Sequence, residues 1–281
     1  MRHRPIRQAQ GRPDGSVWVR THPLTLLHDH TLTTHTHEWD QLTYATAGVL
    51  RVSTRDATWI VPPHRAVWVP AGVAHAEQMF APVSVRTLYF APRIARTLPR
   101  ACCTLNISSL LRELILHVSR IGALDRQTPW HARLIAVLLD QMTEVSEVPL
   151  QLPLPRDARA LRFASILQEA PGDTATVAAL ARQAGASLRT IERLFVRETG
   201  MAVAEWRRRR RLLHAVRLLA EGEPVTNVSM EIGYSSVSAF IAVFKKTFGA
   251  TPSHFRLQTS DSRVPASALS RRAANTPKTS Q

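Results

Sequence analysis

The sequence predicts an α+β protein with an antiparallel β-barrel in its N-terminal part, a helical segment after it and an all-α domain at the C-terminal end. Three observations favour this class. Short runs of β-branched and aromatic residues alternate with turn signals up to about residue 90. A helical period of apolar residues begins near residue 108. A pattern of two short helices then occurs twice, about 48 residues apart.

The N-terminal part is expected to form many short strands. Turn signals at Ala47-Gly48, Pro62-Pro63 and Pro70-Ala71-Gly72 separate the apolar runs. Residues 1–16 are expected to be flexible, and residues 17–95 to form the barrel or a sandwich. The expected strands cover residues 39–45, 48–53, 58–61, 66–69, 75–80 and 83–90.

Residues 96–148 are expected to be mainly helical, with two amphipathic helices joined near residues 122–129. These helices either form the contact of a homodimer or pack onto the barrel. The proline-rich residues 149–157 cannot continue a helix and predict an extended linker. Residues 259–281 show no period and are expected to be disordered.

The repeated pattern in residues 158–258 predicts two helix-turn-helix units. Each first helix has apolar or small residues at the same spacing and ends on a glycine: Val177, Leu180, Ala181, Ala184 and Gly185, then Val225, Val228, Ser229, Ile232 and Gly233. Each second helix opens on a capping serine, Ser187 in the first unit and Ser235 or Ser236 in the second. The faces expected to point inward are Leu188, Ile191, Leu194 and Phe195, then Phe240, Val243 and Phe244, and Gly200 and Gly249 end the units.

The second unit resembles the DNA-binding domain of AraC-type (AraC/XylS) transcriptional regulators. The residues that carry the resemblance are Ile232, Gly233, Tyr234, Ser238, Phe240, Phe244, Lys245, Lys246, Phe248, Gly249, Thr251, Pro252 and Arg256. One departure is Ser229, where the family usually has alanine. The resemblance implies a sequence-specific transcriptional regulator that binds double-stranded promoter or operator DNA, with RNA polymerase as a further candidate partner.

The charge distribution agrees with such a partner. The chain has 36 Lys+Arg and 21 Asp+Glu residues, a net charge of +15. Residues 1–155 hold 16 basic and 11 acidic groups, net +5, and residues 156–281 hold 20 and 10, net +10. The smaller C-terminal part therefore has twice the positive charge, which fits a phosphate backbone and also fits an acidic membrane surface.

The second helix of each unit is expected to lie in the major groove. In the first unit the outward residues are Arg189, Thr190, Glu192 and Arg193, which include bidentate arginine donors for guanine. In the second unit they are Val237, Ser238, Ala239, Ile241 and Ala242, which offer one hydroxyl and otherwise methyl groups. We therefore expect the first unit to dominate base discrimination. The residues expected to contact phosphates are Lys245, Lys246, Arg207 and Arg208, the last two on a helix over residues 206–219 that links the units. Arg211 in the same run matches a family pattern, so its role is either phosphate contact or structural.

Two short motifs in the N-terminal part resemble the cupin motifs. The first comprises His35, His37, Gln41 and Gly48, and the second comprises Pro70, Gly72 and His75. The resemblance implies a site for a divalent transition metal at His35, His37, Gln41 and His75. Gln41 stands where cupins have a carboxylate, and Asp29 and His64 replace leading glycines. The alternative is that the histidines are hydrogen-bonded polar groups that line a ligand pocket.

A small-molecule effector is expected in the mouth of the barrel, between apolar walls and a few polar groups. The residues expected to line this pocket are Trp39, Gln41, Tyr44, Trp59 and Trp68, the alternative being that the aromatic rings belong to the core. The predicted function is thus a regulator controlled by a small molecule or metal, and not an enzyme. The alternative is a cupin metalloenzyme, a dioxygenase or isomerase, fused to a DNA-binding module.

Targeting signals are not evident. The basic N-terminus is not followed by an apolar segment, and no stretch of about 18 apolar residues occurs. We therefore expect a cytoplasmic protein without a membrane partner. The two cysteines, Cys102 and Cys103, are adjacent and predict no disulfide framework.

Overall fold

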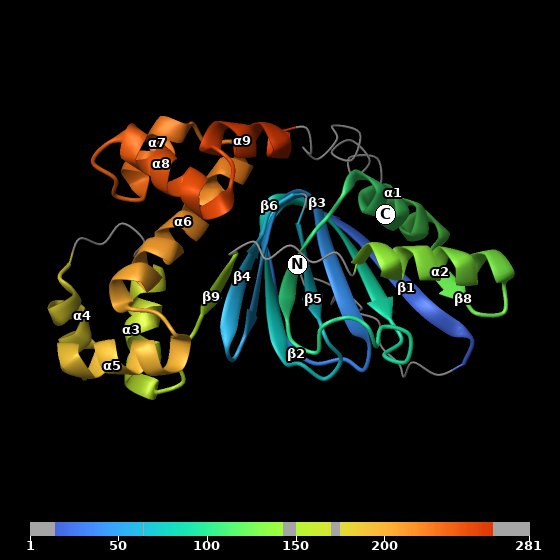
Figure 1. Ribbon diagram of the computed structural model, residues 1–281, viewed down its shortest axis with the longest axis horizontal. Helices are drawn as coiled ribbons and strands as arrows, with labels where there is room; N and C mark the ends of the chain where they lie inside the picture. Colours follow the sequence, from blue (N-terminus) through green and yellow to red (C-terminus); the bar gives the residue numbers. More distant parts are fainter. Residues whose placement is uncertain (1–14, 64, 143–149, 170–174, 261–281) are drawn as a thin grey trace, which may run out of the picture.

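The computed structural model describes residues 15–63, 65–142, 150–169 and 175–260. The β elements lie together on one side and the helical domain lies on the other (Figure 1). The strands are β1 (Val17–Leu26), β2 (His30–His35), β3 (Asp40–Thr54), β4 (Ala57–Val61), β5 (Arg65–Val69), β6 (His75–Phe90), β7 (Cys103–Asn106), β8 (Ala123–Asp125) and β9 (Gln151–Pro153). The α+β prediction is confirmed.

The strands form one antiparallel sheet that is not closed into a barrel. Its main path is β7-β5-β3-β6-β1-β8, while β2 pairs with β6, and β4 pairs with both β3 and β9. The long strands β3 and β6 run side by side from the pair Asp40 and Phe90 to the pair Thr54 and His75. β5 and β1 flank one half of this central pair, and β4 and β2 flank the other half. The sheet therefore has two halves that share β3 and β6.

The turn expected at Ala47-Gly48 is instead a bulge within β3. The register between β3 and β6 shifts at Ala47, and Gly48 has a φ of +73°. A Cβ at Gly48 would lie 2.4 Å from the carbonyl oxygen of Pro82. A bulge that bends the strand needs this conformation, and the close approach of β6 leaves no room for a side chain. The two strands expected over residues 39–53 are therefore one, as are the two expected over residues 75–90.

Two helices cover one side of the sheet. They are α1 (Ser109–Ile121), which Ser108 caps through the Leu111 N–H, and α2 (Pro129–Met142). Their buried residues, including Ile115 and Leu138, share a core with Trp68 and Phe90 of the sheet. These helices were expected either to form a homodimer contact or to pack onto the barrel. Their buried faces pack onto the sheet.

The helical domain contains α3 (Ala158–Glu169), α4 (Val177–Gln183), α5 (Leu188–Thr199), α6 (Val203–Glu221), α7 (Val225–Glu231), α8 (Val237–Phe248) and α9 (Pro252–Ser260). The pairs α4/α5 and α7/α8 are the two predicted helix-turn-helix units. Ser187 caps α5, and Ser236 rather than Ser235 caps α8. Leu188 was expected to point inward but is 37% exposed, because it is the first residue of α5 and lies at the edge of the core.

The segment between the domains is ordered where it is described. β9 adds to the edge of the sheet beside β4, so residues 151–153 are a strand rather than a free linker. The indole N–H of Trp206 on α6 donates to the carbonyl oxygen of Pro153 at 2.7 Å. Val49 and Ile60 of the sheet belong to the same apolar core as α6. The helical domain is thus docked against the sheet along α6, as Figure 1 shows.

Most of the expected flexible N-terminus, Pro149 and most of the expected disordered tail lie outside the described residues, as does His64. In the part of the chain that the structure describes, no helix is long and apolar enough to cross a membrane.

Candidate functional site

The outward face of α5 is polar and accessible. Arg189, Glu192 and Arg193 are exposed, while Ile191, Leu194 and Phe195 are fully or almost fully buried. Thr190 is half-buried, and its hydroxyl lies 2.9 Å from the hydroxyl of the cap Ser187. The packing of three apolar residues fixes the rotation of α5, so the arginines and the glutamate project away from the core.

The outward face of α8 is oriented in the same way, by buried apolar residues on the opposite side of the helix, but it has little hydrogen-bonding capacity. Ser238, Ala239 and Ala242 are exposed and Val237 is half-buried, while Phe240 and Phe244 are fully buried. Lys245 and Lys246 are exposed in the last turn of α8. The two units therefore present different chemistry on similar frames.

The five-arginine run on α6 divides among several roles. Arg208 is exposed, Arg207 is half-buried, and a groove between α6 and α8 is lined by Arg208, Arg209 and Lys246 among others. Arg211 instead reaches the turn of the second unit. Its Nη1 lies 3.5 Å from the carbonyl oxygens of Ile232 and Gly233, and its guanidinium lies 5.4 Å from the ring of Tyr234. The structural alternative for Arg211 is thus supported.

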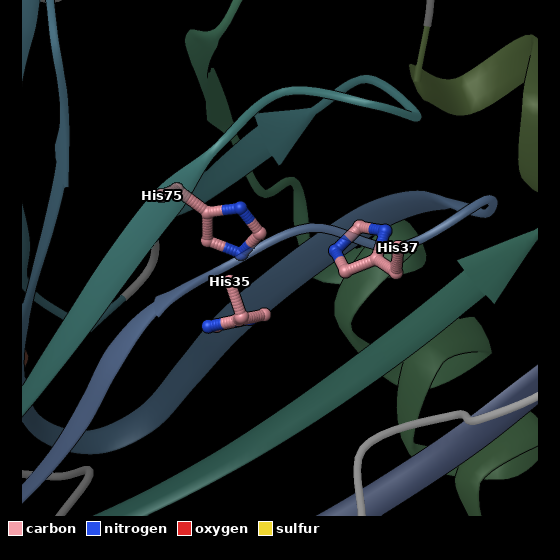
Figure 2. Close-up of side chains that lie close together, drawn as sticks. All are labelled: His35, His37 and His75. Carbon is pink, nitrogen blue, oxygen red and sulfur yellow. The ribbon is translucent and has the colours of Figure 1, made fainter.

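Three histidines of the N-terminal part gather around one point (Figure 2). His35 and His75 are cross-strand partners on β2 and β6, and their ring centroids are 4.3 Å apart. His37 follows β2, and its ring centroid is 5.1 Å from that of His75. One ring nitrogen from each of the three lies within 4.8 Å of the other two.

Backbone hydrogen bonds select the tautomer of all three rings. The Nδ1 atoms of His35, His37 and His75 lie 2.8, 2.6 and 2.9 Å from the carbonyl oxygens of Thr33, Trp39 and Val73. A carbonyl only accepts, so each Nδ1 carries a proton. The Nε2 of His37 then faces a further acceptor, the amide oxygen of Gln41, whereas the Nε2 atoms of His35 and His75 can keep their lone pairs. This arrangement is typical of histidines that bind a metal through Nε2.

Burial favours the neutral form of two of these rings. It lowers the pKa of His75 to about 4 and also lowers the pKa of His37. The Nε2 of His75 is buried and has no hydrogen-bond partner among the residues that the structure describes. A buried acceptor without a donor is costly, and a cation at this point would satisfy it. The neutral rings are also the form that binds metals.

Gln41 lies beside the histidines, as predicted, and leads to a carboxylate that the sequence did not reveal. Its Oε1 is 2.6 Å from His37 Nε2, and its Nε2 donates to Glu77 Oε1 at 2.6 Å and to Thr43 Oγ1 at 2.7 Å. Glu77 is almost fully buried, and burial raises the pKa of its carboxyl group. Glu77 follows His75 by two positions on β6, so strand alternation was the available signal.

The predicted aromatic pocket does not form from the expected residues. Trp39 packs with Tyr89, Trp59 belongs to a second cluster, and Tyr44 and Trp68 belong to a third. All four rings are buried at 3% exposure or less. Of the five expected residues, Gln41 contacts the histidine cluster through its side chain and Trp39 through its backbone carbonyl. The four aromatic rings lie in the apolar core, which supports the alternative for them.

Comparison with known proteins identifies the chain. A family model described as an AraC-like ligand binding domain matches residues 26–204, and one described as a helix-turn-helix domain matches residues 180–258. The HTH-type transcriptional regulator NimR of Escherichia coli (strain K12) is 35% identical over 221 residues, which cover 79% of this chain and 81% of NimR. The chain belongs to the AraC family of transcriptional regulators.

Other known proteins match smaller parts of the chain or match it less closely. The HTH-type transcriptional regulator RipA of Corynebacterium glutamicum is 36% identical over 104 residues, which cover 37% of this chain and 31% of RipA. A crystal structure of unsaturated fatty acid bound ToxT from Vibrio cholerae strain SCE256 aligns with 91% of this chain and all of that chain, at 11% identity and a TM-score of 0.38. The AraC-family assignment thus rests on the family models and on NimR. It makes the chain a DNA-binding transcriptional regulator with an N-terminal ligand-binding domain.

Proposed function

We propose that this regulator reads base edges mainly through α5 and uses α8 for apolar contact and anchoring. The observation that carries this proposal is the contrast between the exposed faces of α5 and α8 on similar frames. Arg189 and Arg193 have the donors that a guanine edge accepts, and Glu192 can accept from cytosine. The residues proposed for base contact on α8 are Val237, Ala239 and Ala242, through methyl groups, and Ser238, through its hydroxyl. Those proposed for phosphate contact are Arg207, Arg208, Lys245 and Lys246.

Selection of genomic fragments with the full-length protein, followed by footprinting, tests this proposal. We expect two protected segments on one face of the duplex, about 10 base pairs apart, with stronger sequence preference in one of them. A single protected segment, or equal preference in both, would contradict the division of labour. The genes beside the selected sites would also indicate the effector. RNA polymerase as a partner stays a prediction.

For the N-terminal domain we propose that a divalent transition metal binds at His35, His37 and His75 and controls the regulator. The support comes from the three Nδ1–H donors held by backbone carbonyls and from the buried Nε2 of His75. The oxygen of Gln41, which lies beside His37 Nε2, is a fourth candidate ligand. Imidazole ligands suit zinc, copper, iron or nickel.

Titration of chelator-treated full-length protein with Zn²⁺, and with Co²⁺ as a spectroscopic probe, tests the metal site. We expect one equivalent to bind, and binding to His35→Ala to be weaker by at least about 100-fold, because even outer-shell partners of metal ligands contribute up to this much. His28→Ala is the matched control, since His28 is an exposed histidine outside the cluster.

The outcomes separate the sensor from the alternative enzyme. Equal binding by wild type and His35→Ala would place the metal elsewhere, and no binding would leave the histidines as polar groups of a pocket. A change in DNA affinity on metal binding supports control by metal. Steady oxygen consumption by an iron-loaded protein would instead support the dioxygenase alternative.

We further propose that α1 and α2 form a homodimer contact through their outer faces. Leu110, Trp130 and Val137 are 54%, 46% and 43% exposed, although the opposite faces of both helices pack on the sheet. Sedimentation of wild type and Trp130→Glu tests this. We expect a dimer for wild type and a monomer for the variant, and a dimer for both would move the contact elsewhere.

A further inference from the structure

Glu77 is a buried acidic residue that is linked to the histidine cluster through Gln41. It is 4% exposed, and its Oε1 accepts from the amide nitrogen of Gln41 at 2.6 Å. Gln41 pairs with Tyr89 in the ladder between β3 and β6, whereas Glu77 pairs with Val52 near the opposite end of the same ladder. The side-chain bond therefore joins the two halves of the sheet beside the histidines.

The hydrogen bonds of Gln41 determine which way its amide points. An amide nitrogen has two N–H donors. In Gln41 they face two acceptors, Glu77 Oε1 at 2.6 Å and Thr43 Oγ1 at 2.7 Å. The amide oxygen is left on the other side, next to His37. In the reversed orientation this oxygen would face the carboxylate of Glu77, acceptor against acceptor, so the carboxylate selects the observed orientation.

This orientation brings acceptors together at the histidine cluster. The oxygen of Gln41 is 2.6 Å from His37 Nε2, while His37 Nδ1 donates to the carbonyl oxygen of Trp39. Two lone pairs that face each other at this distance repel. His75 Nε2 is a further buried acceptor, without a partner in the described part of the chain. A cation at this point would relieve the repulsion and satisfy the buried acceptor.

The proposed ligands themselves carry no negative charge. Three neutral imidazoles and one amide oxygen leave the charge of a divalent cation uncompensated, and burying such a charge is costly. Asp40 is also buried near the cluster, but its Oδ1 accepts from the backbone N–H of Ala71 at 2.8 Å and so holds a turn. Glu77 differs from Asp40 because its carboxylate is bonded to a candidate ligand.

We propose that Glu77 is a positioning residue of the metal site, which holds the oxygen of Gln41 toward the cation and places a carboxylate behind it. This inference rests on the metal site proposed above and goes beyond it. It assigns to Glu77 the negative charge that the motif position Gln41 lacks. Carboxylates that hydrogen-bond to metal ligands fix the orientation of these ligands and strengthen them as donors.

Titration of chelator-treated full-length protein with Co²⁺, followed by visible absorption, and competition with Zn²⁺ test this assignment. Glu77→Gln keeps the size of the side chain, but its amide can face Gln41 with either end, so the orientation is no longer selected. The double variant Gln41→Glu, Glu77→Gln moves the carboxylate to the motif position. Glu38→Gln is the matched control, because Glu38 is exposed and adjacent to His37 in the sequence. Circular dichroism verifies that each variant is folded.

We expect the Kd of Glu77→Gln for Co²⁺ to rise about 10–100-fold and its absorption bands to shift, because an outer-shell partner of a ligand is lost. The double variant should bind within about threefold of wild type or more tightly, because its carboxylate becomes a direct ligand. Glu38→Gln should change the Kd less than about twofold, because an exposed charge contributes little.

The outcomes separate this assignment from the metal site itself. An unchanged Kd and spectrum in a folded Glu77→Gln would overturn the assignment and leave the metal site in place. A double variant that binds as weakly as Glu77→Gln would also overturn it, because returning a carboxylate to the site would then restore nothing. A wild type that binds no Co²⁺ would overturn the metal site and the role of Glu77 together.

Discussion

The two helix-turn-helix units share a frame and differ on their exposed faces. In both, a glycine with positive φ follows the first helix, Gly185 at +79° and Gly233 at +78°. In both, an arginine from the preceding helix reaches the turn. Arg162 of α3 donates to the carbonyl of Ala184 at 3.1 Å, as Arg211 of α6 does near Ile232 at 3.5 Å. The frame is therefore maintained by equivalent contacts.

The difference lies where packing imposes no requirement. The exposed face of α5 has arginine and glutamate, and that of α8 has serine and alanine. Packing determines which residues are buried, and the exposed positions can differ without a cost in stability. Two units with one architecture can thus divide base recognition and attachment to the DNA backbone between them.

The largest expected effect tests whether the shared frame is equally important in both units. Phe195 and Phe240 are both fully buried, the first against Phe163 and Trp206 and the second against Tyr234 and Phe244. Phe195→Ala and Phe240→Ala should each lower the free energy of unfolding by about 3–5 kcal/mol, as ring removal leaves a cavity. Urea unfolding followed by circular dichroism measures this.

Val196→Ala and Met230→Ala are the controls, because these side chains are 56% and 66% exposed. They should cost less than about 0.5 kcal/mol. If one of the two phenylalanine variants lost no more than its control, the units would not have equivalent cores.

The second effect concerns the recognition of DNA bases by α5 and α8. Arg189→Ala should weaken binding to the selected site by about 1–3 kcal/mol and leave scrambled DNA nearly unchanged, because one bidentate base contact is lost. Ser238→Ala at the matching face of α8 should cost less than about 0.5 kcal/mol on either DNA. Arg182→Ala, on the exposed side of α4, is the charge control. Equal losses on selected and scrambled DNA for Arg189→Ala would make Arg189 a phosphate contact.

The helical domain was predictable because its signals are local. Apolar spacing, a capping serine and a final glycine all act within about one or two helical turns. They correctly predicted the buried positions Ile191, Leu194 and Phe195. The prediction that Leu188 points inward was wrong, because the apolar period does not show where the core ends. Ser229, the departure from the family pattern, is buried and its hydroxyl donates to the carbonyl of Thr226 at 2.8 Å.

The N-terminal domain was less predictable because its contacts span long stretches of sequence. The histidine motifs were visible, but the bond between Gln41 and Glu77 depends on the pairing of β3 with β6. Trp39, just before β3, and Trp59 on β4 belong to separate clusters, and strand alternation alone cannot show this without knowledge of how the strands pair. Arg51 of β3 and Arg217 of α6 both lie 5.3 Å from the ring of Phe80, and no local pattern relates residues so far apart.

The third effect concerns the caps that orient the reading helices. The N–H of Thr190 donates to the Ser187 hydroxyl at 3.2 Å, and the N–H of Ala239 donates to the Ser236 hydroxyl at 3.1 Å. Ser187→Ala and Ser236→Ala should each cost about 1 kcal/mol of stability in urea unfolding, because a capping acceptor is lost. Ser235→Ala, at the adjacent exposed position, should cost less than about 0.5 kcal/mol. A larger loss for Ser235→Ala than for Ser236→Ala would move the start of α8 by one residue.

The smallest effect concerns anchoring, and it compares Lys246 with Arg197 in the last turns of α8 and α5. Arg197 donates to Glu198 at 2.6 Å, so its charge is already paired within the protein. Lys246 lines the groove between α6 and α8 together with Arg208. Lys246→Ala should weaken selected and scrambled DNA alike and reduce the slope of log K against log salt by about 0.9, the value for one phosphate contact. Arg197→Ala should change the slope much less, because the charge of Arg197 is already paired with Glu198 and is not expected to neutralise a phosphate. A loss for Lys246→Ala that is confined to the selected site would mean that α8 reads sequence after all, and the two units would then share the task that their exposed faces divide.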